Sequence, residues 1–216
     1  MTSDLRPAGL SLRDRMLKRS FDVVVSFVGL VATSGLIFLA FFAATLDTRK
    51  VGFLAQDRVG RNGKLFKLFK LRTMREIPGV TTHVTTCRDP RITSLGRLLR
   101  RTKIDELPQL LNVLLGHMSL VGPRPDVPGF ADRLEGEDRI ILSVRPGVTG
   151  PATLKFRDEE RLLAKQDDPE RYNREVVFPE KVRLNRAYVE EYRFRSDLRF
   201  IFRTLFAASV SDRSKV

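Results

Sequence analysis

Two adjacent carboxylates, Asp105 and Glu106, lie in a stretch of the chain that is rich in arginine. Arg100 precedes them, and Arg124 follows within the turn Gly122-Pro123-Arg124-Pro125. An ionised Asp can attack phosphorus as a nucleophile, and arginines bind phosphoryl oxygens through two parallel hydrogen bonds. These residue types together therefore indicate phosphoryl transfer. Taken alone, Asp and Glu are also ordinary residues of a first helical turn, so that interpretation stays open.

A helix is expected to follow the two carboxylates. Pro108 fits a helix only near its start, where no backbone hydrogen bond is lost, so we place the start at about residues 104–106. Asp105 and Glu106 then lie at an N-terminus, where free N–H groups and neighbouring arginines are expected to hold Asp105 ionised. Leucines recur at the spacing of one buried helix face, at Leu107, Leu110, Leu111, Leu114 and Leu115.

Further basic residues are candidates for phosphate or substrate binding. Lys70 and Arg72 lie on the second arm of a β-hairpin predicted over residues 51–74, because an Asn62-Gly63 pair favours a type I′ turn. These cations either stay solvated or contact lipid headgroups or substrate phosphates. Arg145 lies in an Arg-Pro-Gly turn whose backbone N–H groups are expected to cradle a phosphate.

Residues 23–46 form an apolar run without any charge. At ~1.5 Å per residue the run reaches ~36 Å, enough to cross a bilayer. Thr33-Ser34-Gly35 interrupts its middle, so the run is either a spanning helix or a re-entrant helix-break-helix. We favour the re-entrant form, because both flanks are basic and give no charge asymmetry to orient a span.

The expected organisation has three parts: a basic segment at 1–19, a membrane-embedded helix at 20–48, and a cytoplasm-facing catalytic domain at 49–216. The fold class is mixed α and β, mostly helical. Residues 193–210 alternate Arg clusters with Phe and Leu. That pattern fits an amphipathic helix on a membrane surface, or equally a helix packed on the core with an exposed basic face.

The composition restricts the classes of binding partner that we expect. With 216 residues, a net charge of +13 and a sequence pI of about 10.5, the chain suits polyanions: nucleic acid, an anionic membrane face or phosphorylated substrates. One cysteine excludes an internal disulfide framework. No nucleic-acid motif is present, so nucleic acid is not expected. A membrane-tethered nucleic-acid-binding protein or a membrane scaffold remains the alternative to an enzyme.

The string RRTKIDELPQLLNVL, followed by MSLVGPRP and VRPGVTG, resembles the bacterial sugar transferase family, the monotopic phosphoglycosyl transferases. The resemblance covers about residues 18–150. It implies transfer of a sugar phosphate from a UDP-sugar to undecaprenyl phosphate, with release of UMP, at the cytoplasmic face of the bacterial inner membrane. This would be the first membrane step of bacterial glycoconjugate synthesis.

The resemblance also implies roles for residues. Asp105 would be the nucleophile and a ligand of Mg²⁺, and Glu106 would orient the site or help to hold the metal. Arg100, Arg124 and Arg145 would clamp phosphate. The sugar and any homo-oligomeric state are left open.

The chain departs from the family pattern at three places. Gly35 stands where the family usually has proline, and His117 stands where it usually has Asp. Residues 151–157 keep only Ala152 and Arg157 of the family's residue types. That last region is expected to face the nucleotide or the sugar, with Arg157 among the substrate-binding residues.

Overall fold

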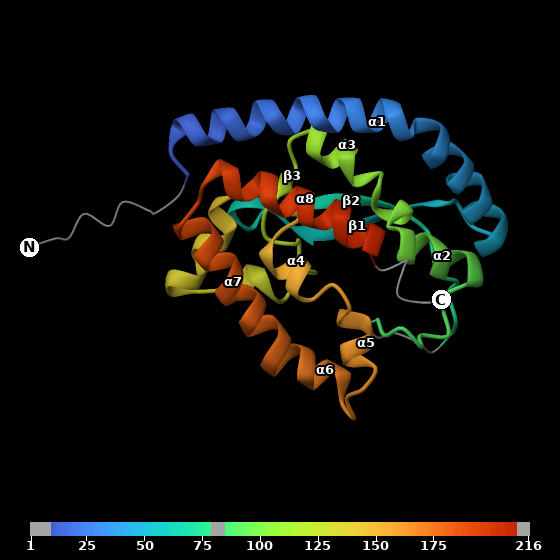
Figure 1. The fold of residues 1–216 in the computed structure, drawn as a ribbon. Helices are drawn as coiled ribbons and strands as arrows, with labels where there is room; N and C mark the ends of the chain where they lie inside the picture. The colour runs from blue at the N-terminus through green and yellow to red at the C-terminus, as the bar shows by residue number, and fades with distance from the viewer. Residues whose placement is uncertain (1–9, 79–84, 211–216) are drawn as a thin grey trace, which may run out of the picture.

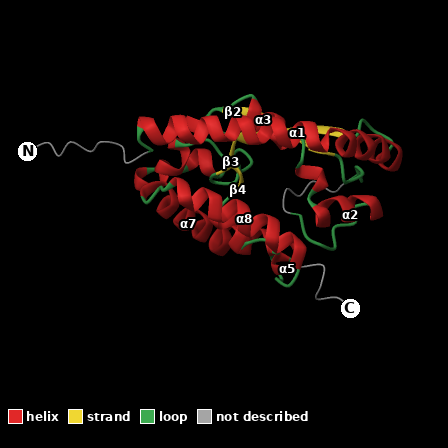
Figure 2. Ribbon diagram, turned by 45° about the horizontal axis from the view of Figure 1, so that its top comes forward, coloured by secondary structure: helices red, strands yellow, loops and turns green. Residues whose placement is uncertain are grey.

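The computed structural model describes residues 10–78 and 85–210 of the chain. Helices dominate and surround two small sheets (Figure 1; Figure 2), so the predicted mixed, mostly helical class is confirmed. The α-helices are α1 (Leu12–Thr48), α2 (Ser94–Thr102), α3 (Gln109–Leu114), α4 (Pro151–Lys155), α5 (Glu159–Leu163), α6 (Pro169–Tyr172), α7 (Phe178–Glu190) and α8 (Phe194–Val210). The strands are β1 (Phe53–Val59), β2 (Leu65–Leu71), β3 (Ser119–Val121) and β4 (Gly147–Thr149).

The predicted hairpin is confirmed by the antiparallel pairing of β1 and β2, in a register that places Val59 opposite Leu65. Asn62 and Gly63 in its turn both have positive φ, at 59° and 76°, as an Asn-Gly pair favours. The buried Asn112 of α3 holds the hairpin against α3 through hydrogen bonds to β2. Its side-chain amide donates to the carbonyl of Lys67 (2.7 Å) and accepts from the N–H of Phe69 (2.9 Å).

Strands β3 and β4 pair in parallel and hold the Pro-Arg-Pro turn in place. A Cβ atom on Gly147 would lie only 2.1 Å from the nitrogen of Gly122, so both positions require glycine for this close backbone approach. The N–H of Gly147 donates to the carbonyl of Pro123 (2.8 Å). That N–H is therefore used within the fold, which argues against the phosphate cradle expected at this turn.

Helix α1 is continuous over 37 residues. Instead of the predicted helix-break-helix, the segment curves around the rest of the molecule (Figure 1). Thr33 donates back to the carbonyl of Gly29 (2.7 Å) and Ser34 to that of Val31 (2.9 Å), and glycine at position 35 weakens a helix without interrupting it. The helix begins at Leu12, so the boundary predicted at 19/20 falls inside it; residues 1–9 lie outside the described part.

Both halves of α1 pack on the same domain. Near its start, Lys18 forms a buried ion pair with Asp197 of α8 (2.5 Å), and Asp22 accepts the N–H of Leu120 of β3 (3.0 Å). Near its end, a second buried cluster joins α1 to β2 and α2: Ala40, Ala44, Leu71 and Leu99. Between these contacts the outer face of α1 exposes large apolar side chains, among them Val24, Phe27, Val31, Phe38, Leu39 and Phe42.

The leucine face predicted for α3 is right only in part, because Leu110 packs against the main core but other leucines are exposed. Leu111 and Leu115 are 40% and 55% exposed, whereas Gln109, Asn112 and Val113 are buried. The reason is that α3 is a six-residue helix held by the polar contacts of Asn112 with β2, so hydrogen bonding decides which face turns inward. The predicted helix start is nearly right, because a 3₁₀ turn at Ile104–Glu106 precedes α3.

Helix α8 has features of both structures considered for residues 193–210, a core-packed helix and a membrane-surface helix. Asp197 is buried, and Phe200 and Ile201 pack against the main core. Phe202 and Leu205, in contrast, are 57% and 63% exposed. One face of α8 is therefore a core face and the other remains a candidate for membrane contact.

Candidate active site

The two carboxylates lie on the 3₁₀ turn between α2 and α3. Lys103, which ends α2, has a positive φ of 60°, and this conformation turns the chain sharply into the Ile104–Glu106 segment. Asp105 is 6% exposed. The turn thus presents both carboxyl groups at the start of α3, as the sequence predicts.

Glu106 is the ionised partner of the Pro-Arg-Pro turn. Arg124 donates two hydrogen bonds to it, from Nη2 to Oε1 (2.8 Å) and from Nη1 to Oε2 (3.4 Å), and Lys103 Nζ lies 3.6 Å from Oε1. Burial alone would raise the pKa of Glu106, but Arg124 and Lys103 outweigh it and lower the pKa to about 2. Glu106 therefore carries a fixed negative charge.

Asp105 differs from the expectation that its neighbours hold it ionised. Burial and the charge of Glu106 raise the pKa of Asp105, against the opposing effects of Lys103, Arg100 and Lys70. Its Oδ1 atom is buried and has no hydrogen-bond partner in the described part of the chain. A cation or an electrophile at this oxygen would relieve the unfavourable desolvation.

The hairpin contributes two cations to the same site. Lys70 of β2 has its pKa lowered to about 8 by burial and by the charges of Arg58 and Arg100, while Asp105 opposes the shift. Arg58 of β1 was not among the site residues predicted from the sequence. Burial is the main cause that lowers its pKa, and the charge of Arg124 is the second. The alternation of side chains along paired strands places Arg58 on the same hairpin face as Lys70, which is the signal that would have found it.

Arg100 reaches the site from α2 and forms an ion pair with Glu160 of α5. Its guanidinium also lies near enough to Asp105 to affect that carboxyl's pKa. The charges of Lys70, Arg100 and Arg124 thus act on the carboxylate pair, and their roles in phosphate binding stay predictions.

Three other predicted phosphate ligands are placed differently. Arg72 donates to the carbonyl of Val51 (2.9 Å), at the far end of the hairpin. Arg145 donates to the carbonyl of Gly116 (2.8 Å), near the end of α3, and its charged neighbours are Arg19, Arg61 and Asp22.

Arg157 is exposed and makes no ion pair or hydrogen bond with the residues that the structure describes. None of these three side chains is brought to the carboxylate pair.

A second charged group borders Arg124 and was also missed. It consists of Asp126, which follows the Pro-Arg-Pro turn, together with Lys181 of α7 and Glu159 of α5. Lys181 Nζ lies 2.7 Å from Glu159. Burial raises the pKa of Asp126 to about 6, although Lys181 and Arg58 act in the opposite direction. These residues come from distant parts of the sequence, so only the fold brings them together.

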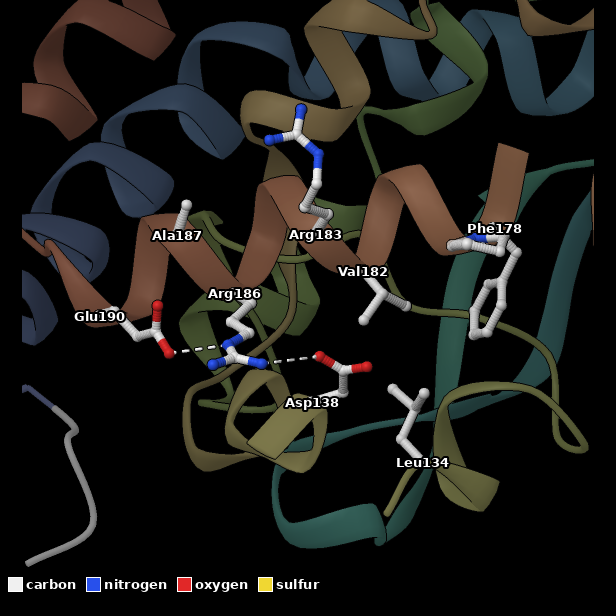
Figure 3. Close-up of a pocket in the computed structure, with 9 residues that line it drawn as sticks. Leu134, Asp138, Phe178, Val182, Arg183, Arg186, Ala187 and Glu190 are labelled. Carbon is white, nitrogen blue, oxygen red and sulfur yellow. Dashed lines mark hydrogen bonds and ion pairs between the residues drawn. The ribbon is translucent and has the colours of Figure 1, made fainter. Parts of the chain in front are cut away.

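A cavity lies on the surface away from the carboxylate pair. A cavity of about 520 Å³ runs between α7 and the 3₁₀ segment Gly136–Ser143 (Figure 3). Arg186 bridges it, with hydrogen bonds to Glu190 (2.8 Å) and Asp138 (3.4 Å). Asp105, Glu106 and Arg124 do not line this cavity, so size alone does not identify the site of chemistry.

The arrangement of two carboxylates among cations agrees with the comparison with known proteins. The family model described as bacterial sugar transferase matches residues 13–211. The chain belongs to the bacterial sugar transferase family. Exopolysaccharide production protein ExoY of Sinorhizobium fredii is 31% identical over 97% of this chain and 91% of its own length. Exopolysaccharide production protein PSS of Rhizobium leguminosarum bv. phaseoli is 35% identical over 89% and 94%.

A third relative is longer. The UDP-glucose:undecaprenyl-phosphate glucose-1-phosphate transferase of Escherichia coli is 34% identical over 94% of this chain but only 42% of its own length. The predictions of the family and of a transferase are therefore confirmed. Helix α1, long and apolar enough to enter a membrane and with only 11% of its apolar window buried, agrees with membrane association.

Proposed function

We propose that this bacterial sugar transferase moves a sugar phosphate from a UDP-sugar to undecaprenyl phosphate and releases UMP through a covalent aspartyl intermediate. One observation carries the proposal: Asp105 presents a buried oxygen without a partner among the described residues, close to Lys70, Arg100 and Arg124. An acceptor-only oxygen among cations suits attack on the phosphorus of an anionic substrate.

The chemistry has two displacements. In the first, an oxygen of Asp105 forms a bond to the β-phosphorus of the donor, and the bond from that phosphorus to the bridging oxygen breaks. UMP leaves with the electron pair. In the second, a phosphate oxygen of undecaprenyl phosphate attacks the same phosphorus and the bond to Asp105 breaks. The product is a lipid diphosphate sugar, and the carboxylate is regenerated.

The cations have separate tasks in this scheme. Arg124, fixed by Glu106, presents a guanidinium next to Asp105, and Arg100 and Lys70 add charge on other sides. Together they stabilise the negative charge that builds on the phosphoryl oxygens as the bond to UMP breaks. Glu106 is therefore assigned to positioning Arg124, rather than to attack on phosphorus.

The carboxylate pair also fits Mg²⁺. No group of three metal-ligating side chains exists in the described residues, but Mg²⁺ is commonly held by one or two carboxylates together with substrate phosphates. Asp105, whose Oδ1 has no hydrogen-bond partner among the described residues, would hold it through one carboxylate oxygen and attack phosphorus through the other. When bound, the ion would neutralise charge on the diphosphate and favour the ionised form of Asp105, whose pKa is raised by burial.

The relatives support the choice of substrates. The Escherichia coli relative is named for UDP-glucose and undecaprenyl phosphate, and a relative from Komagataeibacter xylinus, 37% identical, is named undecaprenyl-phosphate glucose phosphotransferase. We extend the donor class and the acceptor to this chain, with the sugar left as the variable.

We further propose that the chain sits on the cytoplasmic face of the inner membrane without crossing it. The two ends of α1 contact one domain, through Lys18 and Asp197 at one end and Ala44 and Leu71 at the other. A straight span would separate these ends by the thickness of the bilayer. The exposed apolar face of α1 would then lie within one leaflet, with both flanks on the same side.

The test is release of UMP from a panel of UDP-sugars by the purified full chain in detergent, with undecaprenyl phosphate and Mg²⁺ present. Asp105→Asn should abolish release for every donor. Asp57→Asn is the matched control, because Asp57 is an exposed hairpin carboxylate paired with Lys67 (2.8 Å). Absence of UMP release with every donor, or full activity in Asp105→Asn, would contradict the proposal.

A further inference from the structure

The carboxylate of Asp126 lies at the border of the active site, where the charges of Lys181, Arg58 and Arg124 act on it. Its backbone carbonyl accepts the N–H of Val59 at the end of β1 (3.0 Å), which fixes the residue beside Arg58. Lys181 of α7 acts electrostatically on the carboxylate, and Arg124 precedes Asp126 by two residues across a rigid proline. The backbone of Asp126 is therefore held by β1, and charges from β1, α7 and the Pro-Arg-Pro turn act on its carboxylate.

The carboxylate makes no side-chain hydrogen bond or ion pair with any residue in the described ranges, even though cations surround it. Lys181 is instead engaged by Glu159 (2.7 Å). Burial raises the pKa of Asp126 to about 6, and the side chain is half-buried, so the carboxylate stays accessible to a ligand. A carboxylate that accepts no hydrogen bond within the described residues can accept them from a ligand that brings donors.

The position relative to the reaction restricts that ligand. Arg124 is a neighbour of Asp105 and of Asp126, so a phosphoryl group beside Arg124 brings the group attached to it close to Asp126. Phosphate oxygens only accept hydrogen bonds and are repelled by a carboxylate. Sugar hydroxyls donate, and a carboxylate accepts from them.

An aromatic ring completes this side of the site. Two lysines lie near Phe156, with Lys155 Nζ 5.9 Å and Lys181 Nζ 5.8 Å from the ring centre. Residues 151–157, which contain Phe156, are the segment where this chain departs most from the family pattern. Lys181 thus links Phe156 to Asp126, because it lies near the ring and acts electrostatically on the carboxylate. An aromatic ring and a hydrogen-bond acceptor in the same region suit a sugar with its hydroxyls.

We propose that Asp126 accepts hydrogen bonds from hydroxyl groups of the transferred sugar and thereby helps to select the UDP-sugar. The inference rests on the proposed function, because it takes the sugar phosphate donor as the ligand. It assigns no part in bond making to Asp126.

The test compares donors that differ in one hydroxyl. The full chain in detergent, Asp126→Asn and Asp126→Ala are assayed for kcat/KM with the best donor, with its epimers and with its deoxy analogues, and UMP is titrated as an inhibitor. Loss of a charge-assisted acceptor is expected to reduce the preference between the best donor and one analogue by about 10-fold or more. The inhibition constant of UMP should not change. Asp57→Asn, on the outside of the hairpin, should leave both quantities at the values of the unmodified chain.

Two outcomes would overturn the inference. If the UMP inhibition constant rises and all donors weaken by the same factor, Asp126 binds the uridine part. If every donor loses the same fraction of kcat while UMP binding is unchanged, Asp126 acts only on the fold of the Pro-Arg-Pro turn. Failure of the unmodified chain to turn over any donor would count against the proposed function itself, so the two failures are distinguishable.

Discussion

Arg124 and Glu106 are joined by two hydrogen bonds, of 2.8 Å and 3.4 Å, across the two segments that form the candidate active site. Glu106 raises the pKa of Arg124, and Arg124 lowers that of Glu106 to about 2. The backbone of the turn that carries Arg124 also packs closely on Gly147 through Gly122, so both the turn and the guanidinium are held in place. In the proposed mechanism, this pair positions Arg124 to bind phosphate.

Replacement of Arg124 by lysine should lower kcat/KM. Arg124→Lys keeps the charge but cannot make the two-pronged contact with Glu106, so about one charge-assisted hydrogen bond is lost. We expect a fall of about 10-fold or more, equivalent to about 1.4 kcal/mol of transition-state stabilisation. The measurement is the rate of UMP release. Kinetics equal to those of the unmodified chain would mean that Arg124 is merely solvated.

The alkaline side of the pH profile should report Lys70. Its pKa is lowered to about 8, so the protonated form that binds phosphate is lost as the pH rises through about 8, and kcat/KM should fall there. Lys70→Arg keeps its charge at higher pH, so this variant should move the alkaline limb upward by at least one pH unit. An alkaline limb that stays in place in Lys70→Arg would assign it to another group.

How far the sequence predicts this site depends on where each residue lies in the chain. Asp105, Glu106 and Arg124 occur within one short stretch, so residue type and spacing are enough to connect them. Arg58 can be linked to Lys70 only through the pairing of β1 with β2, which places both side chains on one hairpin face. Lys181 is brought to the site by α7, and for this residue only the tertiary structure provides the connection.

The raised pKa of Asp105 was not expected from the sequence, because neighbouring cations, which do lower this pKa, are visible in a sequence and the extent of burial is not. The same holds for α3, where the buried polar contacts of Asn112 override the leucine pattern. In α1 the apolar run was recognised, but the expected break was not found because Gly35 lacks the constraint that proline would impose. Local sequence patterns therefore predict the helices and strands, whereas long-range contacts determine how these elements are oriented.

The buried ion pair between Lys18 and Asp197 should stabilise the attachment of α1. The carboxylate of Asp197 also accepts hydrogen bonds from Tyr188 (2.7 Å) and Tyr192 (3.2 Å). Lys18→Met leaves this charge without its cation, so we expect a loss of about 3 kcal/mol in the free energy of unfolding. Denaturant unfolding in detergent, followed by circular dichroism, measures the change.

Two further variants separate charge from packing in this network. Lys67→Met removes an exposed ion pair with Asp57 and should cost less than about 1 kcal/mol. The double variant Lys18→Met/Asp197→Leu removes both buried charges and should regain part of the loss. If Lys18→Met is as stable as Lys67→Met, the buried pair does not hold α1 to the domain.

The topology of α1 can be tested with single cysteines in a chain whose Cys87 is replaced by serine. The probe cysteines are placed at Leu12 and Lys50, because both positions are exposed. The neighbouring residues are left unchanged, because Ser11 caps the helix and Thr48 is buried. In intact cells a membrane-impermeant thiol reagent should label neither position, because both flanks are proposed to be cytoplasmic. After permeabilisation it should label both. Labelling of Leu12→Cys but not Lys50→Cys in intact cells would mean that α1 crosses the membrane.

The most direct test of the central claim is detection of the covalent bond on Asp105. The full chain is incubated with its UDP-sugar donor, without acceptor, and its intact mass is measured, followed by mapping of the modified peptide. We predict a mass increase of one sugar phosphate at Asp105, formed with release of UMP and removed on addition of undecaprenyl phosphate. The adduct should be absent from Asp105→Asn and present in Asp57→Asn. An adduct that persists in Asp105→Asn, or turnover without any adduct in rapid-quench samples, would contradict the role of Asp105 as nucleophile.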